Sequence, residues 1–304
     1  MTRVAAIDCG TNSIRLLVAD VIGDGLTDVV RRMEIVRLGQ AVDRTGRLAP
    51  EAIERTRVAL ADYAAQVAEL GAERVRMVAT SATRDAANAE DFRSMVTTTL
   101  GVPPEVVSGD EEARLSFAGA VRGLPPSAVP PYLVVDIGGG STEFVVGRDA
   151  PERALSVDLG CVRMTERHLH SDPPTATEIA AATADIESGV DKAIAAVDAA
   201  RAATVVGLAG SVTTVAGLAL GLDAYRPERI HHARIARDDV ARVTAELLAM
   251  TRAQRLALPV MHPGRADVIG AGALVLRIVL DRLGAADVVA SEHDILDGIA
   301  YSIG

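Results

Sequence analysis

The chain has 304 residues, which is enough for one large domain or two of medium size. Its formal net charge of −10 at pH 7 argues against a general nucleic-acid binder, because such a protein usually carries a basic face. The two cysteines show no zinc spacing, no signal peptide is visible, and no apolar run is long enough to span a bilayer. We therefore expect a cytoplasmic protein that binds neither membrane nor nucleic acid.

The positive charges come almost entirely from arginine, because Lys192 is the single lysine. Coding composition is the simpler explanation of this bias, so the bias alone assigns no function. It does have a physical consequence, since the planar guanidinium suits bidentate contacts with phosphate. A few converging arginines and a metal ion can reverse the local potential, so the acidic total does not exclude a polyanionic substrate.

In the first part of the chain, apolar stretches alternate with turns and with helical periodicity. We expect a hairpin made of a strand at 3–8, a tight polar turn at 9–13 and a returning strand, IRLLVADV. Further on we expect a strand at EIVRLG, a helix at 50–70, a strand at RVRMVATSA and helices at 86–100 and 110–122.

The Pro-rich stretch GLPPSAVPP, at 123–131, is the best candidate linker. After it we expect a second strand–turn–strand unit, YLVVDIGGGSTEFVVG, and then strands at 204–210 and 287–291, helices at 211–220, 238–249 and 265–283, and a C-terminal helix. Strands and helices that alternate in this way predict an α/β architecture in both halves. The predicted domains are residues 1–128 and 129–304, with the last helix a candidate to pack back on the first domain.

An internal repeat is the strongest organisational signal. The segment from Asp8 to Val18 aligns without a gap on the segment from Asp136 to Val146, at a constant offset of 136 − 8 = 128. Both copies consist of an apolar strand, an aspartate, a turn of small residues, a serine and another apolar strand. Two unrelated glycine turns are the alternative explanation. The repeat predicts duplicated domains that face each other over a cleft, where ligands commonly bind.

The two repeated turns are suited to binding a phosphate chain and a metal ion. Glycines allow close backbone approach and successive amides form an anion-binding nest, with Gly138, Gly139 and Gly140 as candidates. Side-chain donors are expected from Thr11, Asn12, Ser13 and Ser141. Carboxylates beside phosphate require a cation between them, so we expect Mg²⁺, with Mn²⁺ as the alternative, near Asp8, Asp136 and Glu143.

Three further segments contain candidate functional residues, each with a simpler explanation. Glu111 and Glu112 begin a helix, where acids ordinarily complement the helix dipole, but one of them is also placed to activate a water. Arg84 follows a strand end and is either a phosphate contact or a plain surface arginine. Gly210 and Ser211 form a glycine turn before a helix, which is weak evidence for another phosphate loop. The histidines lack metal-binding spacing and are expected to be structural.

Seven motifs together resemble the exopolyphosphatase / guanosine pentaphosphate phosphohydrolase family of the actin–sugar kinase–Hsp70 superfamily. They are AAIDCGTNSIRLLVAD, ATSATRDAANAEDF, VVSGDEEARLSFAGA, LVVDIGGGSTEFVVG, SVDLGCVRMTE, GLAGSVTT and SEHDILDGI, in this order over essentially the whole chain. The resemblance is greatest to the short actinobacterial exopolyphosphatases. It implies two actin-like (ribonuclease H-like) α/β domains with an interdomain cleft, and a homodimer.

The resemblance also implies roles for individual residues. The second glutamate of SGDEEARL, Glu112, corresponds to the catalytic base, with Glu111 beside it, and the arginine of TSATRDA, Arg84, corresponds to a phosphate contact. The two repeated loops correspond to phosphate and metal sites, and the GLAGS turn to a further phosphate or nucleotide contact at Gly210 and Ser211. The implied reaction is metal-dependent hydrolysis of terminal phosphate from inorganic polyphosphate by a water that Glu112 activates.

Two departures and several alternatives accompany this hypothesis. Cys9 stands where relatives more often carry an aliphatic residue, and the C-terminal helical extension of longer relatives is missing, which favours shorter polyphosphates. The first alternative is a guanosine pentaphosphate (pppGpp) 5′-phosphohydrolase. Another is a sugar-type kinase or nucleotide-binding scaffold of the same superfamily. A regulatory protein that senses polyphosphate or nucleotide without catalysis is the last.

Overall fold

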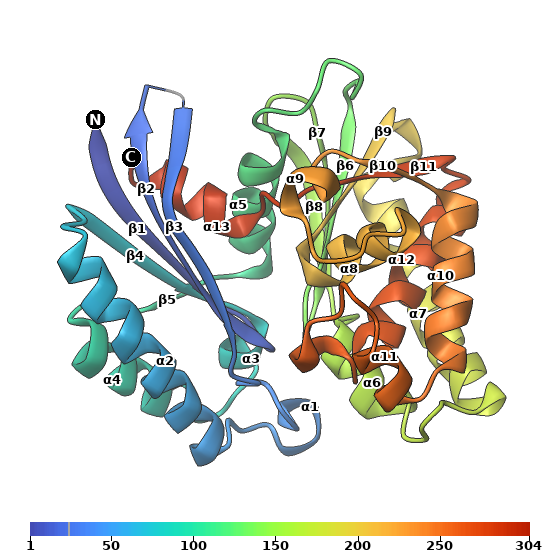
Figure 1. Cartoon of the computed structure of the whole chain (residues 1–304), viewed down its shortest axis with the longest axis horizontal. Coiled ribbons are helices and arrows are strands. Elements are labelled where there is room, and N and C mark those ends of the chain that lie inside the picture. The colour runs from blue at the N-terminus through green and yellow to red at the C-terminus, as the bar shows by residue number, and fades with distance from the viewer. Residues whose placement is uncertain (24) are drawn as a thin grey trace. The chain divides into compact units, whose positions relative to one another are not determined.

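The structure is a computed structural model that describes residues 1–23 and 25–304 (Figure 1). The chain divides into two units, one made of Met1–Gly119 with Ile295–Gly304 and the other of Ala120–Asp294. The boundary predicted at 128/129 thus lies inside the second unit, and the Pro-rich stretch belongs to that unit. The helix that begins at Ile295 groups with the first unit.

The first unit is built on a five-stranded sheet with the order β3-β2-β1-β4-β5. The strands are β1 (Thr2–Cys9), β2 (Ser13–Ile22), β3 (Gly25–Ile35), β4 (Arg74–Ala79) and β5 (Glu105–Val106). Strands β1, β2 and β3 pair antiparallel, whereas β4 and β5 continue the sheet in parallel from β1. The helices of this unit are α1 (Val42–Thr45), α2 (Pro50–Glu69), α3 (Ser81–Arg84), α4 (Ala89–Leu100), α5 (Gly109–Val121) and α13 (Ile295–Ser302).

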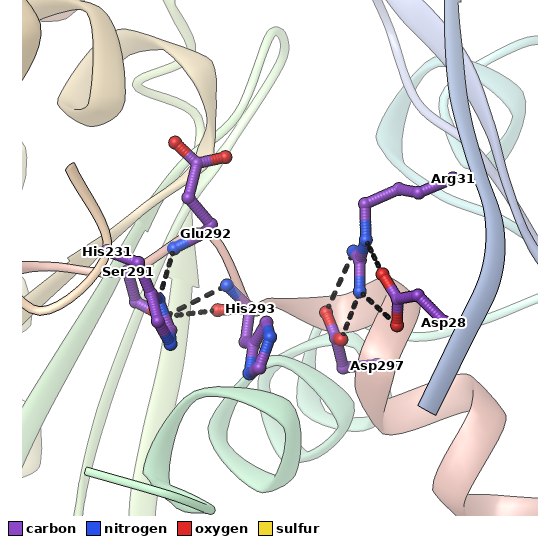
Figure 2. A network of polar contacts seen from close by, with 7 residues as sticks. All are labelled: Asp28, Arg31, His231, Ser291, Glu292, His293 and Asp297. Carbon is purple, nitrogen blue, oxygen red and sulfur yellow. Dashed lines mark hydrogen bonds and ion pairs between the residues drawn. The ribbon is translucent and has the colours of Figure 1, made fainter. Parts of the chain in front are cut away.

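Helices cover both faces of this sheet (Figure 1). Successive side chains of a strand point to opposite faces, so Ile7 packs in one core with α2 and α4, and Ala6 packs in another with α5 and α13. Arg31 of β3 anchors α13, because its guanidinium bridges Asp28 and the fully buried Asp297 (Figure 2). The last helix therefore completes the second face of the first sheet.

The second unit is built on a six-stranded sheet with the order β10-β11-β9-β6-β7-β8. The strands are β6 (Tyr132–Ile137), β7 (Thr142–Gly147), β8 (Pro151–Val157), β9 (Thr204–Leu208), β10 (Arg234–Ala236) and β11 (Asp287–Ala290). The helices are α6 (Cys161–His168), α7 (Ala176–Val197), α8 (Ala209–Ala219), α9 (Pro227–Ile230), α10 (Arg237–Ala249), α11 (Arg252–Leu256) and α12 (Ile269–Leu283), with short 3₁₀ turns at Ala199–Arg201 and Pro263–Arg265. Aliphatic side chains of the sheet, α7, α8, α10 and α12 form its core.

Both sheets share one arrangement, in which three antiparallel strands are followed by two strands parallel to the first. In the second sheet, β10 adds an antiparallel strand at the edge. The sequence repeat is visible in the backbone, because Gly10 donates to the carbonyl of Ser13 at 2.9 Å and Gly138 donates to the carbonyl of Ser141 at 3.0 Å. These pairs are 128 residues apart, since 10 + 128 = 138 and 13 + 128 = 141. This confirms the predicted fold class of two actin-like, ribonuclease H-like α/β domains.

Some elements differ from the sequence prediction. The strand predicted at EIVRLG is wrong in position, because β3 covers Gly25–Ile35 and ends two residues into that motif. The helix predicted from residue 265 begins at Ile269, after a 3₁₀ turn. In the described ranges, which omit only residue 24, no helix is long and apolar enough to cross a membrane.

Candidate functional site

The carboxyl edge of the first sheet gathers three of the predicted segments. The parallel strands β1, β4 and β5 end at Cys9, Ala79 and Val106, and the amide of Thr80 donates to the carbonyl of Cys9. The segments that follow these strands are the first repeated turn, α3 with Arg84, and the start of α5 with the two glutamates. Ligands of α/β sheets commonly bind at the carboxyl ends of such strands.

Glu112 and Arg84 form an ion pair at this edge. Nη1 of Arg84 lies 3.0 Å from a carboxylate oxygen of Glu112 and also donates to the carbonyl of Val107 at 3.0 Å. The side chain of Glu112 is 10% exposed and that of Arg84 is 27% exposed. The structure therefore brings the predicted base and the predicted phosphate contact together, although they come from different helices.

Glu111 has a different environment from its neighbour. Its side chain is 41% exposed, and its carboxylate lies 3.7 Å from Arg76. Successive residues on a helix point about 100° apart, so the two acids of the motif cannot share one partner. The geometry pairs Glu112 with Arg84, whereas Glu111 lies near Arg76 and has the place that acids usually have in a first helical turn.

The first repeated turn is held against two neighbouring segments. The buried hydroxyls of Thr11 and Ser81 lie 2.9 Å apart, and the carbonyl of Asn12 accepts from the amide of Val36. A Cβ atom at Gly39 would lie 2.3 Å from the methyl group of Thr11, so the chain approaches the turn closely there. Thr11 therefore fixes the turn, while Asn12 and Ser13 remain partly exposed.

Asp8, which precedes this turn, is ion-paired. It faces Arg15 in the antiparallel ladder of β1 and β2. Nε and Nη2 of Arg15 both donate to the same carboxylate oxygen of Asp8, at 3.0 and 2.7 Å. The carboxylate predicted as a metal ligand at the first turn thus has a guanidinium beside it.

The second repeated turn is clamped by the N-terminus of α6. The amides of Cys161 and Val162 donate to the carbonyls of Gly138 and Gly139 at 2.9 Å each. These bonds satisfy N–H groups that a helix N-terminus leaves without intrahelical partners. A trans peptide holds its N–H opposite its C=O, so the amides that follow these carbonyls are directed away from α6. The turn therefore presents a row of N–H groups suited to an anion.

Arg163 and Gly160 support this clamp. Nε of Arg163 donates to the carbonyl of Gly140 at 2.7 Å, and its side chain is 12% exposed. A Cβ atom at Gly160 would lie 2.0 Å from the carbonyl oxygen of Gly139, so only glycine allows this approach. Gly160 and Arg163 both lie in the motif SVDLGCVRMTE, which contributes to the family resemblance. The resemblance assigned a role to neither residue.

Asp136 and Glu143 lie directly opposite each other in the ladder of β6 and β7. Asp136 is 7% exposed and Glu143 is 1% exposed, and the hydroxyl of Ser156 donates to Glu143 at 2.8 Å. Two buried carboxylates side by side suit a divalent cation with oxygen ligands. Groups of three or more metal-ligating side chains are absent from residues 1–23 and 25–304. Such a pair suits Mg²⁺, which is commonly held by one or two carboxylates together with water and phosphate oxygens.

The third predicted turn, between β9 and α8, is close to a cation that sequence reasoning missed. A Cβ atom at Gly210 would lie 2.3 Å from the guanidinium carbon of Arg265, so this arginine rests on the turn. Ala209 has a left-handed φ of 67°, which is strained for a residue with a side chain. No local motif marks Arg265, because a lone arginine before a helix has no distinctive pattern.

Ser211 is turned into the core. It is 5% exposed, and a Cβ atom at Gly272 of α12 would lie 2.2 Å from its hydroxyl oxygen. Burial raises the pKa of the neighbouring Cys161 thiol, and a hydrogen bond from Ser211 opposes that rise. Gly210 and Arg265, rather than the hydroxyl of Ser211, thus define the accessible face of this turn.

Three of the six histidines, His231, His232 and His293, form a packed group at the end of β11. The rings of His231 and His232 are stacked with centroids 3.6 Å apart, and that of His293 lies 4.4 Å from His231. The amide of Glu292 donates to Nδ1 of His231 at 3.1 Å (Figure 2). The stacked rings and these hydrogen bonds give the group a structural role.

Comparisons with known proteins show similarity over the whole chain. A family model described as the Ppx/GppA phosphatase family matches residues 17–303. Exopolyphosphatase 2 of Mycobacterium tuberculosis is 53% identical, over 100% of this chain and 99% of that protein. The crystal structure of an exopolyphosphatase-like protein has a TM-score of 0.96 at 47% identity, covering 100% of this chain and 98% of that one. The Ppx-GppA enzyme of Aquifex aeolicus has a TM-score of 0.83 at 31% identity, covering 99% of each chain.

Proposed function

The chain belongs to the Ppx/GppA phosphatase family, and from this premise we propose that it is an exopolyphosphatase, which removes terminal phosphate from inorganic polyphosphate. The pair of Arg84 and Glu112 at the carboxyl edge of the first sheet is the observation that carries the proposal. An arginine for the phosphoryl group and a carboxylate for water are the two groups that hydrolysis of a phosphoanhydride requires.

Glu112 orients the attacking water and accepts its proton. Arg84 holds the carboxylate in position at 3.0 Å and offers its guanidinium to the terminal phosphoryl oxygens. Catalysis then rests on positioning and on charge stabilisation, as is general for phosphoryl transfer. Glu111 has no part in this step.

In the second unit, the amides that follow Gly138 and Gly139 bind phosphoryl oxygens, and Arg265 at the Gly210 turn adds a positive charge to the same edge. Asp136 and Glu143 would hold Mg²⁺. When bound, the ion supplies positive charge to the phosphate chain. The predicted cleft, in which one chain of phosphates meets groups of both units, stays a prediction.

The test is phosphate release from polyphosphate with Mg²⁺ and without an acceptor, for the wild type and two matched variants. General-base assistance is typically worth about 10²–10⁴ in rate, so Glu112→Gln should lower kcat by that factor while phosphate-chain binding survives. Glu111→Gln, which removes the exposed neighbouring charge, serves as the control and should retain activity. Wild-type turnover in Glu112→Gln would exclude the assigned role.

The same assay distinguishes the other phosphohydrolase of the family. The naming of the M. tuberculosis relative, which is similar over its full length, supports polyphosphate as the substrate. Faster phosphate release from pppGpp than from polyphosphate would instead favour the pppGpp phosphohydrolase. Phosphate release without any acceptor would exclude a kinase.

The finer expectations complete the proposal. They are a homodimer, a cytoplasmic location, and Mg²⁺ rather than Mn²⁺ as the working ion. Size-exclusion chromatography with light scattering tests the first. Rates of phosphate release measured with each ion test the last.

A further inference from the structure

The two repeated hairpins differ at one position that faces their shared aspartate. Asp8 lies opposite Arg15 in the ladder of β1 and β2, and Asp136 lies opposite Glu143 in the ladder of β6 and β7. These positions are equivalent, since 8 + 128 = 136 and 15 + 128 = 143. The turn between the two residues has the same glycine-to-serine hydrogen bond in each copy. A cation therefore stands in the first hairpin where an anion stands in the second.

In the first hairpin, the chain supplies its own positive charge. Two nitrogens of Arg15 contact one oxygen of Asp8, at 3.0 and 2.7 Å. Asp8 is 4% exposed and the side chain of Arg15 is 20% exposed, so the pair is largely shielded from water. A guanidinium at this distance neutralises a buried carboxylate, and it repels any second cation that approaches the same oxygen.

In the second hairpin, the equivalent pair consists of two acids. Asp136 and Glu143 are both more than nine-tenths buried and are direct cross-strand partners. Like charges opposite each other on adjacent strands are unfavourable, and the cost rises with burial. A divalent ion between the two carboxylates converts this repulsion into attraction.

We propose that Arg15 neutralises Asp8 at the first hairpin, as a divalent ion neutralises Asp136 and Glu143 at the second. The chain then binds one ion, and Asp8 is not a ligand. This inference rests on the proposed function for the identity of the ion, and it revises the prediction that Asp8 shares the metal site. Duplication gave two equivalent aspartates, and the residue seven positions later decides which of them takes a metal.

The test measures Mn²⁺ binding to the purified full chain without substrate, by electron paramagnetic resonance titration. The matched variants are Asp8→Asn and Asp136→Asn, which make the same change at equivalent positions. The wild type should bind one ion, Asp136→Asn should lower the affinity by at least about tenfold, and Asp8→Asn should leave it unchanged. If Asp8→Asn weakens binding as much as Asp136→Asn does, the proposal is overturned.

A gain of binding provides the second test. Arg15→Glu recreates in the first hairpin the acid pair of the second, so this variant should bind two Mn²⁺ ions per chain, and Asp8→Asn added to it should restore one. A folded Arg15→Glu chain, checked by circular dichroism, that binds a single ion would contradict the proposal. If this variant does not fold, the asparagine pair alone decides. None of these readouts uses hydrolysis, so failure of phosphate release would count only against the proposed function.

Discussion

Arg163 acts on the second repeated turn through the backbone carbonyl of Gly140. Its Nε–H bond to Gly140 fixes the last of the carbonyls that turn toward α6. Loss of a hydrogen bond from a charged donor costs about 1.5–3 kcal/mol, which corresponds to roughly ten- to a hundredfold in an equilibrium constant. Its effect should therefore appear in how tightly the loop holds phosphate.

We expect Arg163→Met to raise KM for polyphosphate by roughly ten- to a hundredfold, with a smaller change in kcat, because the loop loses its preferred conformation. Arg163→Lys should recover part of the loss, since an ammonium can still donate to the carbonyl. Arg167→Met, one turn later on α6 and paired with Asp185, is the control. Equal KM values for the two methionine variants would show that Arg163 does not position the loop.

His232 links stability to pH. Burial, and then the nearby His293, lower its pKa from the usual value of 6.5. The ring of His231 is stacked on that of His232, and Nε2 of His232 is buried with no hydrogen-bond partner among residues 1–23 and 25–304. The folded state therefore binds a proton less readily than the unfolded state. The contribution of neutral His232 to stability is fully present above about pH 6.5 and is lost as the pH falls below that value.

Thermal unfolding between pH 8 and pH 5 checks this linkage. The Tm of the wild type should fall more on acidification than that of His232→Asn, a replacement that tolerates the left-handed φ of 65° at this position. His170→Asn removes an exposed histidine and should leave the wild-type slope unchanged. Parallel slopes for the wild type and His232→Asn would mean that the His232 ring is not responsible for the loss of stability in acid.

The sequence predicted some site residues and could not resolve others. It singled out Arg84 and Glu112, and the structure pairs them. The local pattern left open which of Glu111 and Glu112 acts as the base, because both occupy a first helical turn, and only the resemblance to the family pointed to Glu112. It had no means of finding Arg163 and Arg265. Their roles depend on contacts with residues distant in sequence, Gly140 and Gly210, rather than on a local motif.

At the scale of elements, α13 packs on the first unit through a close approach of two backbones. A Cβ atom at Gly298 would lie 2.0 Å from the carbonyl oxygen of Leu115 in α5. Alanine is favoured over glycine in a helix by about 1 kcal/mol, so propensity alone would make Gly298→Ala stabilising. A backbone oxygen cannot move aside as a flexible side chain can. The steric overlap should therefore outweigh the gain in helix propensity and make Gly298→Ala destabilising.

Gly298→Ala should lower the free energy of unfolding by about 1–3 kcal/mol, the usual cost of overpacking, as measured by urea denaturation. Gly25→Ala is the matched control, because a Cβ atom there meets its nearest neighbour at 3.4 Å and its φ is not left-handed. If the two variants are equally stable, α13 adjusts its position without cost and the close approach has no energetic role.

Elements with a clear apolar pattern were predictable, and elements without one were missed. The helix Pro50–Glu69 matches the prediction at 50–70 because Pro50 and Gly71 mark its ends. Strand β3 was missed because, at the edge of the sheet, none of its residues is fully buried and the strand lacks a clear apolar pattern. Helix α7 was also missed, although it spans 22 residues.

At the scale of the whole molecule, the duplication was the most predictable feature. A constant offset of 128 residues is a property of the sequence alone, and the two sheets share their strand arrangement as the repeat requires. The boundary was harder to place. The Pro-rich stretch at 123–131 marks a change in composition. The chain instead passes from one unit to the other at 119/120 and again at 294/295, because the units are defined by packing rather than by composition.

The chain passes from the first unit to the second and back again, and this order has a consequence for its biosynthesis. Domains generally fold in the order in which they leave the ribosome. Here residues 295–304, which cover one face of the first sheet, are translated only after residues 120–294. The apolar side chains on that face, among them Val4 and Leu17, lack the cover of α13 while residues 120–294 are being translated. A nascent chain of this protein therefore offers a binding surface to chaperones until residues 295–304 have emerged.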